Sequence, residues 1–66
     1  MSHMVHVDML DDEGNWKDSA TPHFPVVPMT GDFITFGLAT WEVLKRVIYS
    51  GGDSVIVAEI TVKMVM

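Results

Sequence analysis

His6 and Asp8, two positions apart in the stretch VHVDML, are the first residues whose types and spacing point to chemistry. In a strand this spacing puts both side chains on one face, where the carboxylate could orient the imidazole or both could bind a metal ion. A metal site needs a third ligand, which His23 supplies only if a proline-containing segment folds back onto the first strand. Solvent-facing pairs of this kind are more common, so we predict no metal site and no cofactor.

Residue types that perform covalent or acid–base catalysis lack a suitable setting. The chain has no cysteine, and Ser19, Ser50 and Ser54 lie in turn-rich stretches without a neighbouring histidine. Asp11 and Asp12 are adjacent in a loop, with no apolar surroundings that would prepare either for acid catalysis. We therefore predict that the protein is not an enzyme.

Five residues are candidates for contact with a ligand or a partner. Arg46 is suited to bidentate phosphate contact, and Trp41 and Tyr49 beside it could stack on a base, as a nucleotide ligand requires. Alternatively, Arg46 lies on a solvated face, where the aliphatic part of its side chain covers apolar surface. Trp16, beside an acidic turn, and Phe24, between prolines, could anchor a protein interface or pack over one end of the fold.

Negative charge is concentrated near the start of the chain. The formal net charge is −5, and only Lys17 offsets the acids of the first 18 residues, which are Asp8, Asp11, Asp12, Glu13 and Asp18. Direct nucleic-acid binding is disfavoured, because phosphates are bound by clustered Lys and Arg. The turn formed by Asp11, Asp12 and Glu13 could mimic nucleic acid or meet a basic partner, although such charge runs are more often solvated loops.

Alternating apolar residues predict how these side chains are positioned. The stretch 4–10 alternates as a strand does, DDEGN has the chemistry of a hairpin turn, and WKDSA then returns as a second strand carrying Trp16. Three prolines between Thr21 and Thr30 exclude a helix and predict an extended crossing segment. In PMTGDFITFG the proline, glycine and aspartate predict a corner that turns the chain into the next strand.

The stretch ATWEVLKRVIYS allows two interpretations. Its spacing fits a helix over residues 38–49, but alternation would put Trp41, Val43, Val47 and Tyr49 on one strand face. We favour the strand, because β-branched and aromatic residues are dense there and SGGDS joins it by a hairpin turn to an unambiguous last strand. The last strand has a predicted core side, which is Ile56, Ala58, Ile60, Val62 and Met64. Val55 and Val57 on its other side would face a second layer or another subunit.

We therefore predict one all-β domain over residues 4–66, preceded by an expression-vector remnant in residues 1–3. The fold class is a small five-stranded SH3-like or partly open antiparallel barrel, with an α+β fold as the alternative if residues 38–49 are helical. A chain of 66 residues without disulfides has a thin core, so we expect a homo-oligomer. No apolar run is long enough to span a bilayer and no signal peptide is evident, so a cytoplasmic protein without membrane contact is expected.

The order of these segments resembles a group of small bacterial and phage β-proteins. They share an Asp-Gly-like first turn, here Asp12 to Gly14, a Pro-x-x-Gly-Asp strand entry at Pro28, Gly31 and Asp32, and a closing valine-rich strand over 55–62. The resemblance implies an SH3-like barrel in a bacterium or a phage-infected cell, often of unassigned function. It transfers no catalytic residue.

Three functions follow as hypotheses. The first is a homo-oligomeric binding module that acts by protein contact or by sequestering a small ligand, such as a nucleotide, between subunits. The second is a structural protein whose only activity is self-assembly. The third is an acidic inhibitor that mimics nucleic acid.

Overall fold

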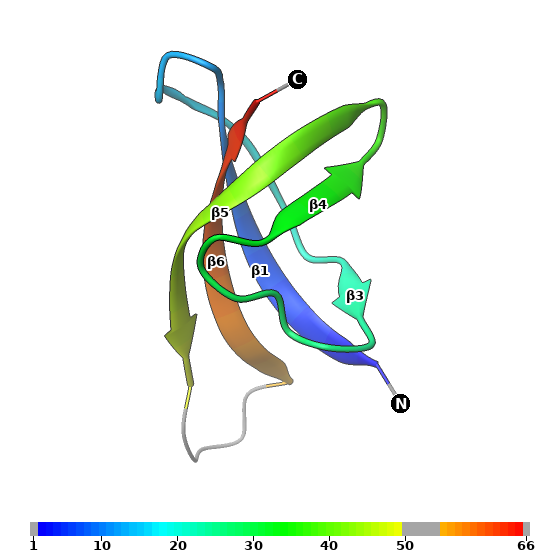
Figure 1. The fold of residues 1–66 in the computed structure, drawn as a ribbon. Helices are drawn as coiled ribbons and strands as arrows, with labels where there is room; N and C mark the ends of the chain where they lie inside the picture. Colours follow the sequence, from blue (N-terminus) through cyan, green and yellow to red (C-terminus); the bar gives the residue numbers. More distant parts are fainter. Residues whose placement is uncertain (1, 50–54, 66) are drawn as a thin grey trace.

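The computed structural model describes residues 2–49 and 55–65. All regular elements in these ranges are strands: β1 (His3–Leu10), β2 (Trp16–Ala20), β3 (His23–Phe24), β4 (Phe33–Phe36), β5 (Ala39–Ile48) and β6 (Ile56–Met64) (Figure 1). The all-β prediction is confirmed. The helical alternative for residues 38–49 is wrong, since β5 occupies most of that segment. The predicted SGGDS turn lies at residues 50–54, outside the described residues.

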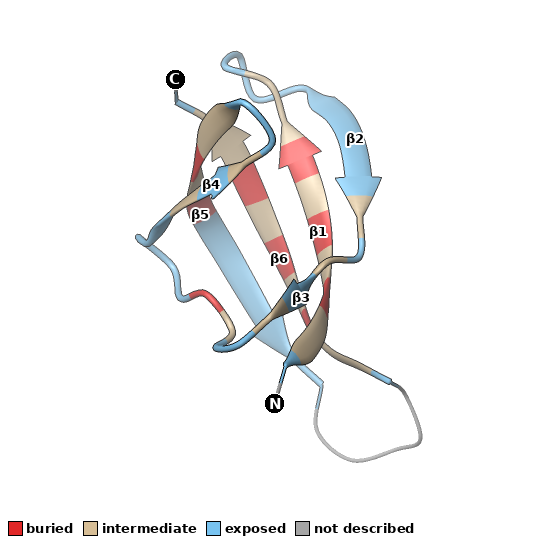
Figure 2. Cartoon of the chain, turned by 90° about the vertical axis from the view of Figure 1, so that its right-hand side faces the viewer, coloured by how far each residue is buried: buried red, intermediate tan, exposed pale blue. Residues whose placement is uncertain are grey.

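The strands form one curled sheet in the order β2-β1-β6-β5-β4, and β3 pairs with the start of β1. The sheet is bent into a half-barrel (Figures 1 and 2), as the prediction of a small, partly open barrel requires. The antiparallel prediction is wrong for one central pair, because β1 runs parallel to β6. Side-chain alternation shows which face of a strand is apolar but not the direction of its neighbour, so the sequence pattern could not reveal this pairing.

The first hairpin follows the sequence prediction. Gly14 has a positive φ of 87°. The Asp11 N–H donates to the Asn15 carbonyl at 2.8 Å, which closes the turn. β2 and then β3 run along the same side of β1, and β3 pairs with His3 and Met4. β1 therefore begins at His3, inside the stretch that sequence analysis had assigned to a vector remnant.

The PMTGD corner turns the chain into β4 as predicted. The Asp32 N–H donates to the Met29 carbonyl at 2.9 Å, and the Asp32 carboxylate accepts the Met29 N–H at 2.8 Å. Gly31 has a φ of 93°, the conformation that a type II turn demands at this position. Gly31 and Asp32 both hydrogen-bond Val43, so the turn ends in a bulge that joins it to β5.

The concave face of the half-barrel holds the core. Its buried side chains come from β1, β5 and β6: Val5, Val7, Met9, Trp41, Val43, Ala58, Ile60 and Val62. The chain between β3 and β4 crosses in front of this face (Figure 2), and its Val27 packs against the core. Phe24 of β3 and Ile34 of β4 pack against the core as well. The predicted core side of the last strand is thus confirmed at its three central positions.

A bulge in β5 divides that strand into two halves with different faces. Val43 pairs with Val62 and Lys45 with Thr61, so Leu44 is an extra residue. Because directly paired residues share a face, Arg46 opposite Ile60 lies on the concave side, and Val47 opposite Glu59 lies on the convex side. The prediction that Trp41, Val43, Val47 and Tyr49 share one face is therefore wrong beyond Val43.

Candidate interaction surface

Within residues 2–49 and 55–65, no strand lies beside the outer side of the second half of β5. β4 pairs only with Ala39–Glu42, and the hydrogen bonds from the PMTGD corner reach Val43. From Leu44 to Ile48, no strand in the described part of the chain pairs with the outer side of β5. All five residues are exposed, as Figure 2 shows for the lower half of the strand. We call Leu44–Ile48 the free edge of β5.

The free edge of β5 combines apolar and basic side chains. Leu44, Val47 and Ile48 are large exposed hydrophobic residues, and they extend from both faces of the sheet. Lys45 and Arg46 are two of the four basic residues of the chain. An exposed apolar edge with unpaired backbone groups is the structure to which a strand from another chain adds.

The predicted nucleotide-type pocket is not formed within one chain. Trp41 is 5% exposed and belongs to the core, and its Nε1–H donates to the Phe36 carbonyl at 3.2 Å. Arg46 is exposed on the concave side, whereas Tyr49 makes its contacts on the convex side. The structure therefore does not bring Trp41, Arg46 and Tyr49 together.

Tyr49 instead joins a polar cluster on the convex face. Its hydroxyl donates to Glu59 Oε2 at 2.6 Å. This hydrogen bond, helped by desolvation and by the negative charges of Glu59 and Asp8, raises the pKa of Tyr49 above its usual 10.0. His6 lies opposite Glu59 on β1, and its Nε2–H donates to Asp8 Oδ1 at 3.0 Å. The cluster lies on the convex face, beside the free edge of β5.

His6 and Asp8 share one face as predicted, but His23 does not join them. His23 pairs with Met4 in the short β3 ladder, and its Nδ1 lies 3.4 Å from Ser2 Oγ. Among the residues that the structure describes, no three His, Asp or Glu side chains are grouped to hold a metal ion.

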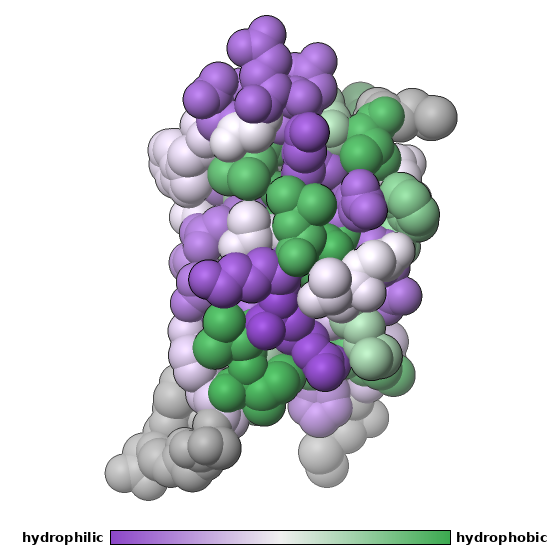
Figure 3. Space-filling view, turned by 60° about the vertical axis from the view of Figure 1, so that its left-hand side comes forward, coloured by the Kyte–Doolittle hydropathy of each residue, from purple (hydrophilic) through white to green (hydrophobic). Residues whose placement is uncertain are grey.

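β2 forms a second exposed edge, at the opposite end of the sheet. It is the last strand of the sheet order in the described residues, and Trp16 at its start is 64% exposed. Trp16 pairs with Leu10, whose neighbour on β6 is Lys63, so its side chain lies on the convex face. The turn before it forms the hydrophilic cap at the top of Figure 3.

The acidic turn has one structural carboxylate and two free ones. Asp11 Oδ1 accepts the N–H groups of Glu13 and Asn15, both at 2.9 Å, so this side chain builds the turn. Asp12 and Glu13 are exposed. Nucleic-acid mimicry would therefore depend on Asp12 and Glu13. A partner that bound Asp11 Oδ1 would have to replace the hydrogen bonds that shape the turn.

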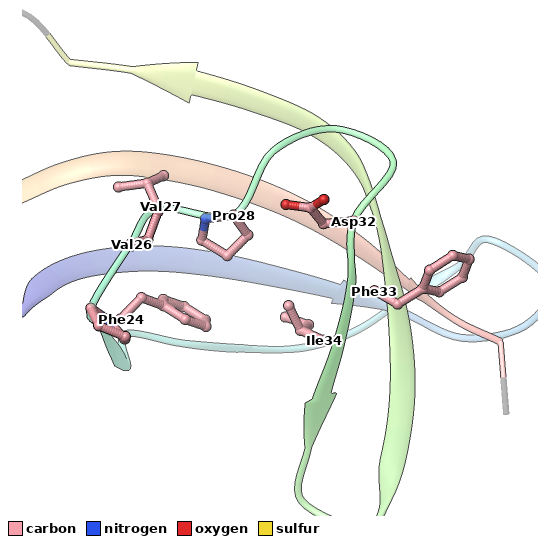
Figure 4. A pocket seen from close by; sticks show the side chains of 8 residues that line it. Phe24, Val26, Val27, Pro28, Asp32, Phe33 and Ile34 are labelled. Carbon is pink, nitrogen blue, oxygen red and sulfur yellow. The ribbon is translucent and has the colours of Figure 1, made fainter.

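Phe24 lines an open hollow of about 300 Å³ between the crossing segment and β4. In Figure 4 the Phe24, Pro28 and Ile34 side chains face the hollow, Asp32 lies at its rim and Phe33 points away. Phe24 also packs against the core, as expected for a crossing segment that covers the barrel.

The alternation of apolar residues does not reveal that Leu44, Val47 and Ile48 form an exposed surface. A usable signal was the unequal length of two adjacent strands, since FITF can pair with only part of the ten-residue strand that follows it. In the part of the chain that the structure describes, half of the longer strand is then left without a partner strand on that side.

No family, no curated protein and no solved structure matched this chain when it was compared with each. The described residues contain no helix that is long and apolar enough to cross a membrane.

Proposed function

We propose that this protein is a non-enzymatic, homo-oligomeric binding module that associates with other chains by strand addition at the free edge of β5. The observation that carries the proposal is the exposure of Leu44–Ile48, in the longest strand of the sheet, with no strand beside its outer side in the described residues.

The small core supports association. The core of the described residues consists of only eight buried side chains, while Val47, Ile48 and other large apolar side chains remain in solvent. In the space-filling view of Figure 3, hydrophobic side chains form separate patches with hydrophilic ones between them. A strand added to β5 would cover Leu44, Val47 and Ile48, and burial of this apolar area would stabilise the complex.

The other hypotheses receive less support from the geometry. A nucleotide pocket within one chain would need Arg46 and Tyr49 on one side of the sheet, and they lie on opposite sides. Nucleic-acid mimicry would rely on Asp12 and Glu13, because Asp11 is hydrogen-bonded within its turn. Self-assembly without a further ligand uses the same edge as the proposed module.

Sedimentation velocity over a wide range of protein concentrations tests the proposal. The wild-type protein should associate as its concentration rises. The double variant V47T/I48T keeps β-branched side chains but removes apolar surface from both faces of the free edge. We expect its association to weaken by about tenfold or more, because the apolar area that it buries is smaller.

The matched control is V26T/V65T, which makes the same kind of change at two exposed positions outside the strands. It should associate as the wild type does. A wild-type protein that stays monomeric at every concentration, or two double variants that behave alike, would contradict strand addition at β5.

A further inference from the structure

We infer that the free edge of β5 pairs with the outer edge of β2 from a second copy, so that the subunits join head to tail. This inference rests on the proposed function and specifies which surface of the second copy is used. It follows from the charges, the faces and the lengths of the two edges.

The two edges differ in charge. Lys45 and Arg46 lie on the free edge of β5, and the nearest acid across the sheet, Glu59, is already hydrogen-bonded to Tyr49. β2 and the turn before it hold four carboxylates against the single ammonium group of Lys17. These are Asp11, Asp12, Glu13 and Asp18. Pairing β5 with β2 therefore brings the basic edge of one copy to a strand of no net charge that follows the acidic turn of the next copy.

Pairing of β5 with β5, or of β2 with β2, between two copies is electrostatically unfavourable. Two β5 edges related by a twofold axis would place Lys45 and Arg46 near the same residues of the other copy. Two β2 edges paired antiparallel about a twofold axis would place Asp18, at the centre of the strand, opposite Asp18 of the other copy. Like charges facing each other across strands destabilise a sheet, so unlike edges are favoured over both twofold arrangements.

The faces of the two edges also match. A sheet that continues from one copy into the next keeps its convex side on one side of the assembly. Trp16 lies on the convex face of β2, and Val47 lies on the convex face of β5. The continued sheet therefore places an exposed indole on the same surface as an exposed valine, a favourable type of cross-strand contact.

The two edges are also of equal length. β2 has five residues, the same number as Leu44–Ile48. The β4 edge is a weaker partner for β2 and its acidic turn, because Phe33–Phe36 contains no basic residue. A head-to-tail contact leaves one free edge at each end of a growing assembly, which closes into a ring or extends as a filament.

Two complementary variants test this arrangement by native mass spectrometry. K45E/R46E blocks the β5 edge and keeps β2 intact, and W16A/D18K blocks β2 and keeps β5 intact. Each variant alone should lose at least about tenfold in association relative to the wild type. An equimolar mixture should form heteromers that neither variant forms alone, because the intact β5 edge of W16A/D18K meets the intact β2 edge of K45E/R46E, and the two altered edges also carry opposite charge.

Every other outcome overturns the head-to-tail arrangement. Self-association of W16A/D18K without heteromers would show a β5–β5 contact, and self-association of K45E/R46E would show a contact that does not need β5. A wild type that associates while the mixture of variants stays monomeric would place the interface elsewhere. If the wild type itself is monomeric, the proposed function fails as well, so the two failures are distinguishable. The masses of the variants differ, and heteromer formation would itself show that both are folded.

Discussion

The ionisation of the Tyr49 hydroxyl is a probe of the hydrogen bonds on the convex face. The hydroxyl donates to Glu59 Oε2 at 2.6 Å, and ionisation would replace this bond with repulsion between two anions. We predict that absorbance at the tyrosinate band, followed against pH, gives a pKa for Tyr49 above 10.0. The variant Glu59→Gln should move the titration down toward that value. The measurement is unambiguous because Tyr49 is the only tyrosine in the chain.

The same hydrogen bond makes stability depend on pH in alkaline solution. The pKa of Tyr49 is raised in the folded state, so the stabilisation is fully present below pH 10.0 and is lost as pH rises through the folded-state pKa. The melting temperature of the wild type should therefore fall more steeply above pH 10 than that of Tyr49→Phe. Parallel curves for the two proteins would contradict the hydrogen bond.

Local turns could be predicted from residue types because their chemistry is local. Gly31 and Asp32 have the conformation and the hydrogen bonds that their residue types predict. The role of Asp11 was less visible, since its carboxylate serves backbone groups in its own turn while its neighbours are free. The sequence of adjacent acidic residues does not indicate which carboxylate accepts the backbone hydrogen bonds of the turn.

At the scale of an element, the β4–β5 hairpin depends on Gly37. Its two-residue turn, Gly37 and Leu38, has a φ of 68° at the glycine, as a type II′ turn requires at its first central position. This replaces the Asp-Gly type of turn expected in hairpins. Leu38 at the tip is fully exposed.

Substitution at the two turn positions should have different effects. Gly37→Ala should lower the free energy of unfolding by about 1 kcal/mol or more, because alanine resists a positive φ. A Cβ at this position meets nothing within 4 Å, so the cost is backbone strain and not a clash. Leu38→Ser, the matched control, should change it by less than about 0.5 kcal/mol. Urea unfolding measures both, and equal effects would contradict the turn assignment.

The strands themselves were predictable, but the faces of β5 were not. Alternation correctly identified the core positions of β6, because that strand is regular through Ala58, Ile60 and Val62. In β5 the extra residue is Leu44, which is apolar like its neighbours and has no distinctive sequence signal. The bulge exchanges the faces of every later residue, so Val47 and Tyr49 do not share the face of Trp41. Arg46 and Tyr49 are separated for a different reason, because residues three positions apart in a regular strand lie on opposite faces.

At the scale of the whole molecule, the order of the strands in the sheet could not be predicted from the sequence. β1 and β6 lie side by side at the centre of the sheet and run parallel, although they are at opposite ends of the sequence. Hairpin signals link only neighbouring segments, so they could predict β1 with β2 and β4 with β5. The prolines of the crossing segment carry the chain from one side of the half-barrel to the other, and this leaves β2 and the lower half of β5 as exposed edges.

A thin core and exposed edges together predict that stability depends on protein concentration. The core that the described residues form, with eight buried side chains, is small for a chain without cysteine, so contacts between copies should supply part of the stability. By mass action, the melting temperature of the wild type should rise by roughly 3–8 °C for each tenfold increase in concentration. K45E/R46E, which cannot offer its β5 edge, should melt at a lower temperature that does not change with concentration. Scanning calorimetry at several concentrations measures both, and a wild-type melting temperature independent of concentration would show that the half-barrel is stable without a second copy.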